Sequence, residues 1–183
     1  AKTAGAVTLL DASQTLAHRP VRPAELNADL LELTGHKGLH GPPGTGGLYI
    51  SRALELEKII VGGTGVRSDL ELHPPEMPMR LEAGTPNVPA FAGMAAALRW
   101  VAERGESFAR HERQLATRLR EELCQTAGVR LFDAGSEAER VGVVSFRLDR
   151  WDVEETAYVL SQSFGVLCRS GLHCAPLIHE FIG

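Results

Sequence analysis

Two polar stretches, Asp11-Ala-Ser-Gln14 and Thr34-Gly-His-Lys-Gly38, each follow a short apolar run. The runs cover residues 6–10 and 28–33; both are compatible with β-structure and bounded by polar residues or glycine. They predict neighbouring strands of an α/β sheet. Because ligands gather at the carboxyl ends of strands in such sheets, we expect the two polar stretches to line a site.

Asp11 and Lys37, at these two strand ends, are the pair of groups that a pyridoxal phosphate (PLP) site requires. A lysine amine forms a Schiff base with the cofactor, and a carboxylate keeps the pyridine nitrogen protonated so that the ring withdraws electrons. On position alone, Lys37 is more simply a surface lysine and Asp11 a turn residue. The two residue types by themselves leave this choice open.

The chain has 183 residues, 44% of them hydrophobic and 23% charged, a composition typical of a globular protein with one core or two small ones. A net charge of −4 without a basic cluster argues against binding to nucleic acid or to an anionic membrane. No apolar run approaches the ~18 residues of a membrane span, and no signal-peptide pattern is recognisable. Three cysteines, an odd number, favour reduced thiols and a cytoplasmic location. The spacing of histidines and cysteines predicts no metal site.

The remaining patterns predict alternating helices and strands. An Ala-rich apolar segment at 89–100 predicts a buried helix, and apolar residues at helical spacing predict a longer amphipathic helix over about 107–126. An acidic first turn after Asp152 predicts a third helix. Further strands are expected at 47–50, 129–132, 141–148 and 166–169. The second part of the chain therefore describes a compact α+β unit, with a boundary within about 97–105.

Four motifs resemble the cysteine desulfurase and selenocysteine lyase branch of the class-V aminotransferases. They are Asp-Ala-Ser-Gln at 11–14, Thr-Gly-His-Lys at 34–37, Arg-Leu-Glu-Ala-Gly-Thr-Pro-Asn at 80–87 and Cys-Arg-Ser-Gly-Leu-His-Cys-Ala-Pro at 168–176. Their order and their spread over almost the whole chain make the match specific, whereas Gly-His-Lys alone would be weak.

This resemblance implies the α/β fold type I of PLP-dependent transferases. Residues 1–100 are then the second half of the PLP-binding large domain, with the remainder of its mixed sheet, and residues 101–183 a truncated, small C-terminal α+β domain. Because the resemblance covers only the second half of such enzymes, we expect a fragment that lacks part of the pocket.

The resemblance also implies how the cofactor is held. Lys37 forms the Schiff base and carries the substrate's α-proton, while Asp11 faces the pyridine nitrogen. The residues that bond the cofactor's oxygen atoms are Gln14, at the phenolic oxygen, and Thr34 and His36, at the phosphate.

Thr85 matches a family residue that reaches across the interface of a homodimer to the partner's phosphate. The same residue is equally explained as a turn threonine before Pro86. The resemblance thus implies a homodimer, and the simpler interpretation of Thr85 stays open.

Cys174 matches the family's sulfur-accepting nucleophile, and Arg169 resembles the arginine that opens the same loop and binds a carboxylate or the thiolate. A cation beside a cysteine favours the thiolate, which is the reactive form. Cys124 and Cys168 are instead predicted to be small buried hydrophobes. The short segment between Arg169 and Cys174 resembles the second group of desulfurases, which often need a dedicated acceptor protein.

The function implied is that of a PLP-dependent cysteine desulfurase or selenocysteine lyase; as a desulfurase it turns cysteine into alanine and leaves a persulfide on Cys174. The sulfur then passes to an acceptor protein for iron–sulfur cluster or thio-cofactor assembly. Cysteine, selenocysteine and cysteine sulfinate differ at one atom and are not distinguished. Two alternatives stay open: another class-V aminotransferase or lyase that does not use Cys174, and a catalytically inactive fragment that acts as a folded scaffold.

Overall fold

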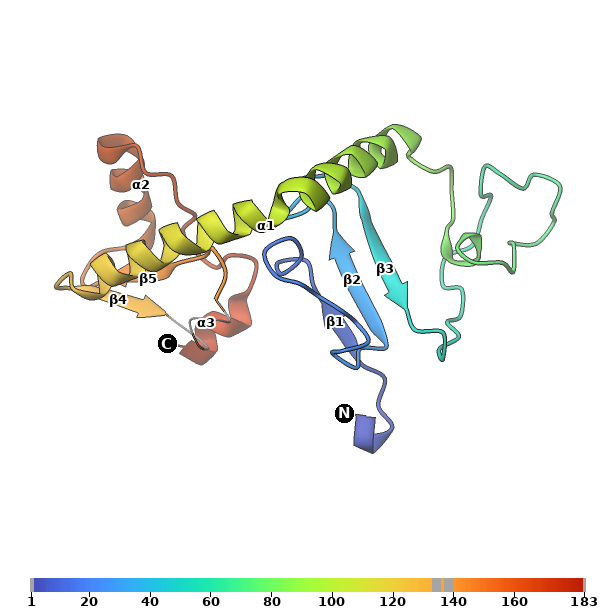
Figure 1. The fold of residues 1–183 in the computed structure, drawn as a ribbon, viewed down its shortest axis with the longest axis horizontal. Helices are drawn as coiled ribbons and strands as arrows, with labels where there is room; N and C mark the ends of the chain where they lie inside the picture. The colour runs from blue at the N-terminus through green and yellow to red at the C-terminus, as the bar shows by residue number, and fades with distance from the viewer. Residues whose placement is uncertain (1, 133–135, 137–139, 183) are drawn as a thin grey trace. The chain divides into compact units, whose positions relative to one another are not determined.

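The computed structural model describes residues 2–132, 136 and 140–182, and the chain divides into two compact units, residues 1–110 and 111–183. Among the described residues, the first unit carries a three-stranded sheet and the second a two-stranded one (Figure 1). Helix α1 (Val88–Cys124) begins in the first unit and ends in the second. A domain boundary at residue 100 stays a prediction.

The sheet of the first unit is mixed. After the short 3₁₀ helix η1 (Lys2–Ala4), strand β1 (Leu9–Asp11) pairs in parallel with β2 (Leu30–Thr34). Strand β3 (Gly46–Ile50) then pairs antiparallel with β2 (Figure 1). A parallel pair beside an antiparallel one makes the mixed sheet that the resemblance implied.

Strand β1 begins later than the predicted range 6–10, because Thr8 has other partners. Its N–H and its hydroxyl both donate to Asp29 Oδ2 at 2.9 Å, in place of a ladder carbonyl. At the other end, β1 includes Asp11, which pairs with Glu32. Ala12 N–H continues the ladder by donating to Glu32 O at 3.0 Å. Asp11 is therefore held within the sheet.

The loop from residue 35 to residue 45 reverses the chain between β2 and β3. Gly35 N–H donates to Thr45 O at 2.8 Å, and Gly41 N–H donates to Gly35 O at 2.7 Å. Met94 of α1 packs on the same turn, since a Cβ on either glycine would run into its sulfur. A Cβ on Gly35 would also overlap Thr45 Oγ1. Only glycine therefore allows this turn to close against α1.

The small core of the first unit lies where the sheet, this loop and α1 meet. Its buried apolar side chains come from all three: Ala12, Ala28, Leu31, Leu39 and Met94. Beside it, the rings of His40 and Trp100 stand edge to face with centroids 5.0 Å apart, and Phe108 lies 5.0 Å from Trp100. Burial and ring contacts thus tie the loop after β2 to α1.

Between β3 and α1 the chain is irregular and exposed, apart from the 3₁₀ helix η2 (Met79–Leu81). His73 lies between the carbonyl oxygens of Gly62, at 3.0 Å, and Met79, at 2.8 Å. Arg80 forms an ion pair with Glu55 at 2.8 Å. Side-chain contacts thus tie this irregular segment together.

The two helices predicted at 89–100 and 107–126 are one continuous helix, α1. The prediction of a break was wrong because residues 101–106 contain no proline, and Gly105 is buried against Val101 within the helix. The prediction that its first half is buried was also wrong, since Phe91 is 48% and Leu98 44% exposed. Met94 faces the loop after β2.

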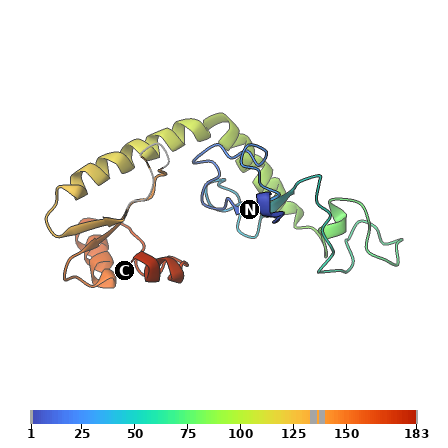
Figure 2. The same cartoon turned by 90° about the horizontal axis from the view of Figure 1, so that it is seen from below.

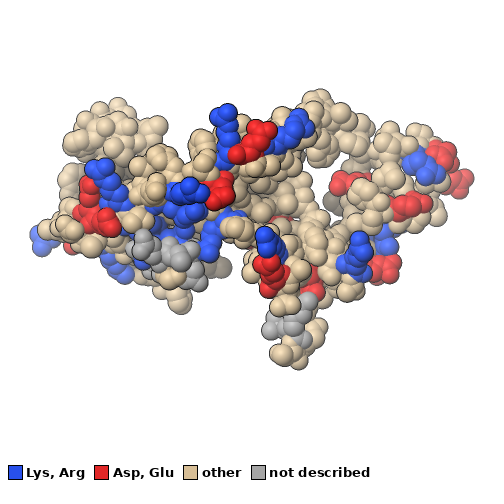
Figure 3. Space-filling view, in the orientation of Figure 1, with Lys and Arg blue, Asp and Glu red and all other residues tan. Residues whose placement is uncertain are grey.

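Charged side chains line the exposed surface of α1 in pairs of opposite sign. Arg110 bonds Glu106 at 2.8 Å, and Arg118 bonds Glu122 at 3.1 Å, both with the i,i+4 spacing that stabilises helices. Acidic and basic side chains are intermixed over the face that Figure 3 shows. Within the part of the chain that the structure describes, no helix has both the length and the apolar character of a membrane span.

The second unit combines strands β4 (Val129–Phe132) and β5 (Ser145–Leu148), which pair antiparallel, with helices α2 (Val153–Phe164) and α3 (Pro176–Ile182) (Figure 2). Asp152 begins α2 as its N-cap: its Oδ1 accepts from the N–H groups of Glu154 and Glu155 at 2.8 and 3.1 Å. Gly165 ends α2 in the left-handed conformation, at φ 66°. The helix predicted after Asp152 is confirmed.

The strand predicted at 166–169 is not formed among the described residues. A strand needs a ladder partner, and Val166 N–H instead donates to Leu160 O at 3.0 Å, which closes the end of α2. Cys168 follows in this uncovered segment and is exposed, and so is Cys124 at the last residue of α1. The prediction that both thiols are buried was therefore wrong.

Replacing Gly35 by Ala is expected to destabilise the first unit by about 1–3 kcal/mol, because the new methyl group would overlap Thr45 and the Met94 sulfur. Gly63, whose added Cβ would meet nothing within 4 Å, is the matched control, and Gly63→Ala should stay within about 0.5 kcal/mol of the parent. Urea unfolding measures both. Equal stability of the two variants would contradict the packing described for this turn.

Candidate active site

The first group of predicted site residues lies at one edge of the first sheet. Because β1 and β2 are parallel, their carboxyl ends meet at the same edge. Asp11 is the last residue of β1, and Lys37 follows the end of β2, Thr34, within one short turn. Gln14 lies exposed in the turn after β1. The structure thus brings the acid and the lysine to one edge.

The pKa of the Asp11 carboxyl is lowered from its usual 3.8. The largest cause is the Ser13 backbone N–H, which donates to Asp11 Oδ1 at 2.8 Å, and the Ser13 hydroxyl adds to it. Partial desolvation opposes these bonds, and the positive charge of Lys37 lowers the pKa further. Asp11 is therefore an exposed, ionised carboxylate that experiences the charge of Lys37.

The turn that carries Lys37 packs tightly on the segment that follows β1. A Cβ on Gly38 would overlap Leu16 O and would lie 2.9 Å from His18 Nε2. His40 N–H donates to Lys37 O at 2.9 Å and closes the turn on its other side. Glycine next to the lysine is thus required for the close approach of the two segments.

Thr34 and His36 contact each other: Thr34 Oγ1 lies 3.0 Å from His36 Nδ1. Both flank Lys37 at the end of β2, with His36 exposed and Thr34 half-buried. A hydroxyl and an imidazole in this position can donate hydrogen bonds to an anion. Thr85, in contrast, is exposed beside Gly65, whose added Cβ would lie 3.4 Å from Thr85 Oγ1.

The second group of predicted residues belongs to the second unit. Arg169 donates to Cys174 Sγ at 2.9 Å, and both side chains are exposed. Residues 169–174, here called the cysteine loop, end with His173 and Cys174 in the left-handed region, at φ 52° and 61°. Ala175 N–H donates to Leu172 O at 2.9 Å across this turn. The cation and the thiol are thus in direct contact.

Two side chains that the sequence did not single out also contact the cysteine loop. Glu154 of α2 accepts a hydrogen bond from Ser170 Oγ, and His179 of α3 reaches Leu172 O at 3.1 Å and stacks on His173. Glu154 was interpreted only as favourable charge at the start of a helix. The available signal for α3 was Pro176, because proline is favoured at the first position of a helix.

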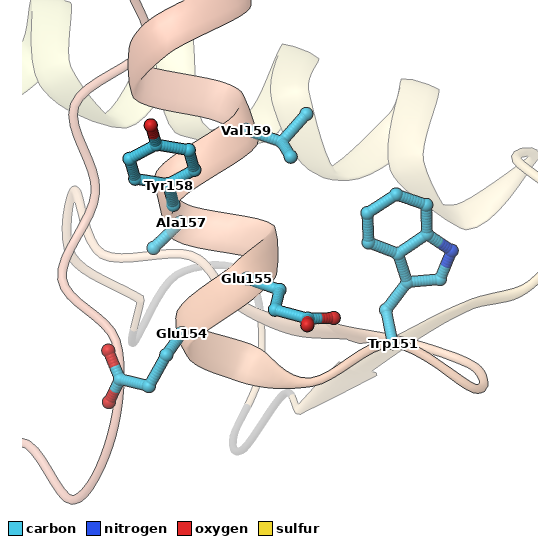
Figure 4. Close-up of a pocket in the computed structure, with 6 residues that line it drawn as sticks. All are labelled: Trp151, Glu154, Glu155, Ala157, Tyr158 and Val159. Carbon is cyan, nitrogen blue, oxygen red and sulfur yellow. The ribbon is translucent and has the colours of Figure 1, made fainter.

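An open groove of about 690 Å³ lies along α2 in the second unit (Figure 4). Its lining residues are Trp151, Glu154, Glu155, Ala157, Tyr158 and Val159. None of the predicted site residues lines it. The position of this groove therefore adds no support to the predicted site.

The class-V aminotransferase family matches residues 1–183. The chain belongs to this family. Relatives include a probable cysteine desulfurase of Xylella fastidiosa, 34% identical over 188 residues, and one of Pyrococcus abyssi, 35% identical over 183 residues. These matches cover 100% and 95% of the chain but 44% of each relative. The chain thus spans less than half the length of these relatives.

Solved structures of similar proteins support the same family. The cysteine desulfurase CsdA of Escherichia coli superposes with a TM-score of 0.84 at 30% identity, over 99% of the chain and 45% of that protein. The apo cysteine desulfurase of Thermococcus onnurineus NA1 gives 0.81 at 30% identity, over 98% and 46%. The α/β fold that the sequence predicts for this class-V aminotransferase is therefore confirmed.

Titration of Asp11, followed by carboxyl ¹³C NMR, is expected to show a pKa below 3.8. Because folding lowers this pKa, the ionised carboxylate stabilises the fold above pH 3.8, and the contribution is lost as the pH falls through the folded-state pKa. Ser13→Ala should raise the pKa, and Lys37→Met should raise it less. If the Asp11 pKa stayed the same in Lys37→Met, the charge of Lys37 would not act on Asp11, and the described proximity of the two side chains would be contradicted.

Proposed function

We propose that this class-V aminotransferase chain is part of a PLP-dependent cysteine desulfurase. The observation that carries the proposal is the parallel pairing of β1 with β2, which places Asp11 and Lys37 at one sheet edge. PLP, when bound, withdraws electrons from the substrate's α-carbon and so makes its proton acidic. The names of the relatives, cysteine desulfurases, support the choice of reaction.

The residues at this edge fit such a cofactor. The lowered pKa of Asp11 keeps its carboxylate ionised, the form that would pair with a protonated ring nitrogen. The Lys37 amine is exposed, so that an aldehyde can reach it. Thr34 and His36 lie beside it as donors for a phosphate. Acid, amine and phosphate donors are the set that the cofactor's groups require.

Each of these side chains then has a definite role. Lys37 Nζ would hold the cofactor through its aldehyde carbon, and the free amine would carry the substrate's α-proton. Asp11 would stabilise the proton on the ring nitrogen. Gln14 would donate to the phenolic oxygen. Because Lys37 lies on the turn packed at Gly38, its backbone is held in place while its side chain moves.

In the sulfur-transfer step, the Cys174 thiolate attacks the sulfur of the substrate cysteine. A sulfur–sulfur bond forms, the substrate's sulfur–Cβ bond breaks, and Cβ takes up a proton, so that cysteine and a thiol become alanine and a persulfide. Arg169 donates to Cys174 Sγ at 2.9 Å and so contacts the atom that attacks. It also offers a guanidinium for the substrate carboxylate.

Partners beyond the substrate are proposed on the same basis. Thr85 is exposed and accessible to a second copy of the chain, which supports its role at the partner's phosphate in a homodimer. Cys174 is exposed on a short loop, which supports transfer of its sulfur to an acceptor protein. We place this protein in the cytoplasm, where such sulfur serves iron–sulfur cluster assembly.

Addition of PLP to the purified protein, followed by removal of the unbound cofactor, is expected to leave protein-bound absorbance at about 400 nm that Lys37→Ala abolishes. Lys58, also exposed in the first unit, is the matched control, and Lys58→Ala should keep the absorbance. Absorbance in neither the parent nor the control would favour the inactive scaffold. If the absorbance persisted in Lys37→Ala, Lys37 would not be the residue that forms the Schiff base with PLP.

Cys174→Ala is expected to lower sulfide release from cysteine in the presence of a reductant by at least about 100-fold, because the nucleophile is lost. Cys124→Ala, which removes another exposed thiol, should leave the rate unchanged. The PLP absorbance should persist in both variants. An unchanged rate in Cys174→Ala would favour a class-V aminotransferase or lyase that does not use this thiol.

A further inference from the structure

The cysteine loop has a backbone conformation that needs support. His173 and Cys174 both have positive φ, at 52° and 61°, where a side chain with a Cβ approaches its own backbone too closely. Such conformations persist where the surrounding contacts determine them. In this conformation of the loop, Arg169 contacts Cys174 Sγ at 2.9 Å.

Support comes from the first turn of α2. Glu154 Oε2 accepts a hydrogen bond from Ser170 Oγ. The other carboxylate oxygen, Glu154 Oε1, lies so close to Gly171, at φ +79°, that an added Cβ would be 3.2 Å from it. Both oxygens of one carboxylate therefore face two successive residues of the cysteine loop.

Glu155 lies next to Glu154 but does not take part in this contact. Figure 4 shows the two carboxylates on opposite sides of α2, with Glu155 directed toward Trp151. Both residues donate their N–H groups to Asp152 and lie at the same end of the helix. Their charges interact alike with the helix dipole, and only Glu154 contacts the loop.

We propose that Glu154 is a positioning residue for Cys174, acting through Ser170 and Gly171. It fixes the middle of the cysteine loop, so that Arg169 and Cys174, at its two ends, stay in contact. Without it the loop loses this closed form, and Cys174 Sγ loses its contact with Arg169. The proposal rests on the proposed function, in which Cys174 accepts the sulfur, for its catalytic consequence.

Alkylation of Cys174 by iodoacetamide, followed by mass spectrometry, measures the reactivity of the thiolate without cofactor or substrate. Exposed contacts are weak, so Glu154→Ala is expected to slow alkylation of Cys174 by about three- to fivefold. Cys124 in the same sample is the internal reference and should keep its rate. Glu155→Ala is the matched control and should leave both rates unchanged. Equal effects of Glu154→Ala and Glu155→Ala would overturn the proposal.

Ser170 variants test the contact from the other side. Ser170→Ala should slow alkylation of Cys174 as much as Glu154→Ala does, and the double variant should slow it no further. Ser170→Thr, which keeps the hydroxyl, should react at the parent rate. Additive effects, or no rescue by threonine, would contradict positioning through this bond. If Glu154→Ala does not fold, the comparison of Ser170→Ala with Ser170→Thr still shows whether this hydrogen bond positions Cys174.

Sulfide release separates this proposal from the proposed function. If Cys174→Ala abolishes sulfide release, Cys174 is the sulfur acceptor. Glu154→Ala should then lower kcat for release three- to fivefold, the same factor by which it slows alkylation, and should leave KM for cysteine unchanged. Where Cys174→Ala has no effect on release, the desulfurase function fails, but the alkylation rates still confirm or refute the role of Glu154.

Discussion

The parallel pairing of β1 with β2 is the constraint on which the candidate site depends. Strand β1 is only three residues long, and its position is set by the register that places Asp11 opposite Glu32. A shift by one residue would turn Asp11 to the other face of the sheet. The buried side chain of Asp29, bonded to Thr8 at the start of β1, holds this register. The buried carboxylate of Asp29 therefore determines where the exposed carboxylate of Asp11 lies.

The sequence predicted this edge of the sheet well because its signals are local. Short apolar runs that end in polar residues indicated β1 and β2, and the motifs around Asp11 and Lys37 indicated the family to which the chain belongs. The strand at 129–132 was predicted with its observed limits. In each case, alternating or apolar runs and their boundaries carry the information that decides the element.

Predictions failed where the outcome depends on contacts between distant residues. Helix propensity alone does not show whether α1 is interrupted or which of its faces is covered, so Phe91 and Leu98 were wrongly placed in a core. The segment after Gly165 has the composition of a strand but no described strand beside it. The contact of Glu154 with Ser170 joins residues sixteen positions apart and leaves no sequence pattern. Packing, which the sequence does not display locally, decides such cases.

The thioether of Met94 occupies the space between Gly35 and Gly41 so closely that neither position has room for a methyl group. Oxidation to the sulfoxide adds an oxygen atom and turns an apolar group into a polar one. In the closed turn this oxygen would have to displace the backbone on which Lys37 is carried. Oxidation of this sulfur atom, which belongs to a different element and takes no part in the proposed chemistry, would therefore disturb the turn that carries the lysine.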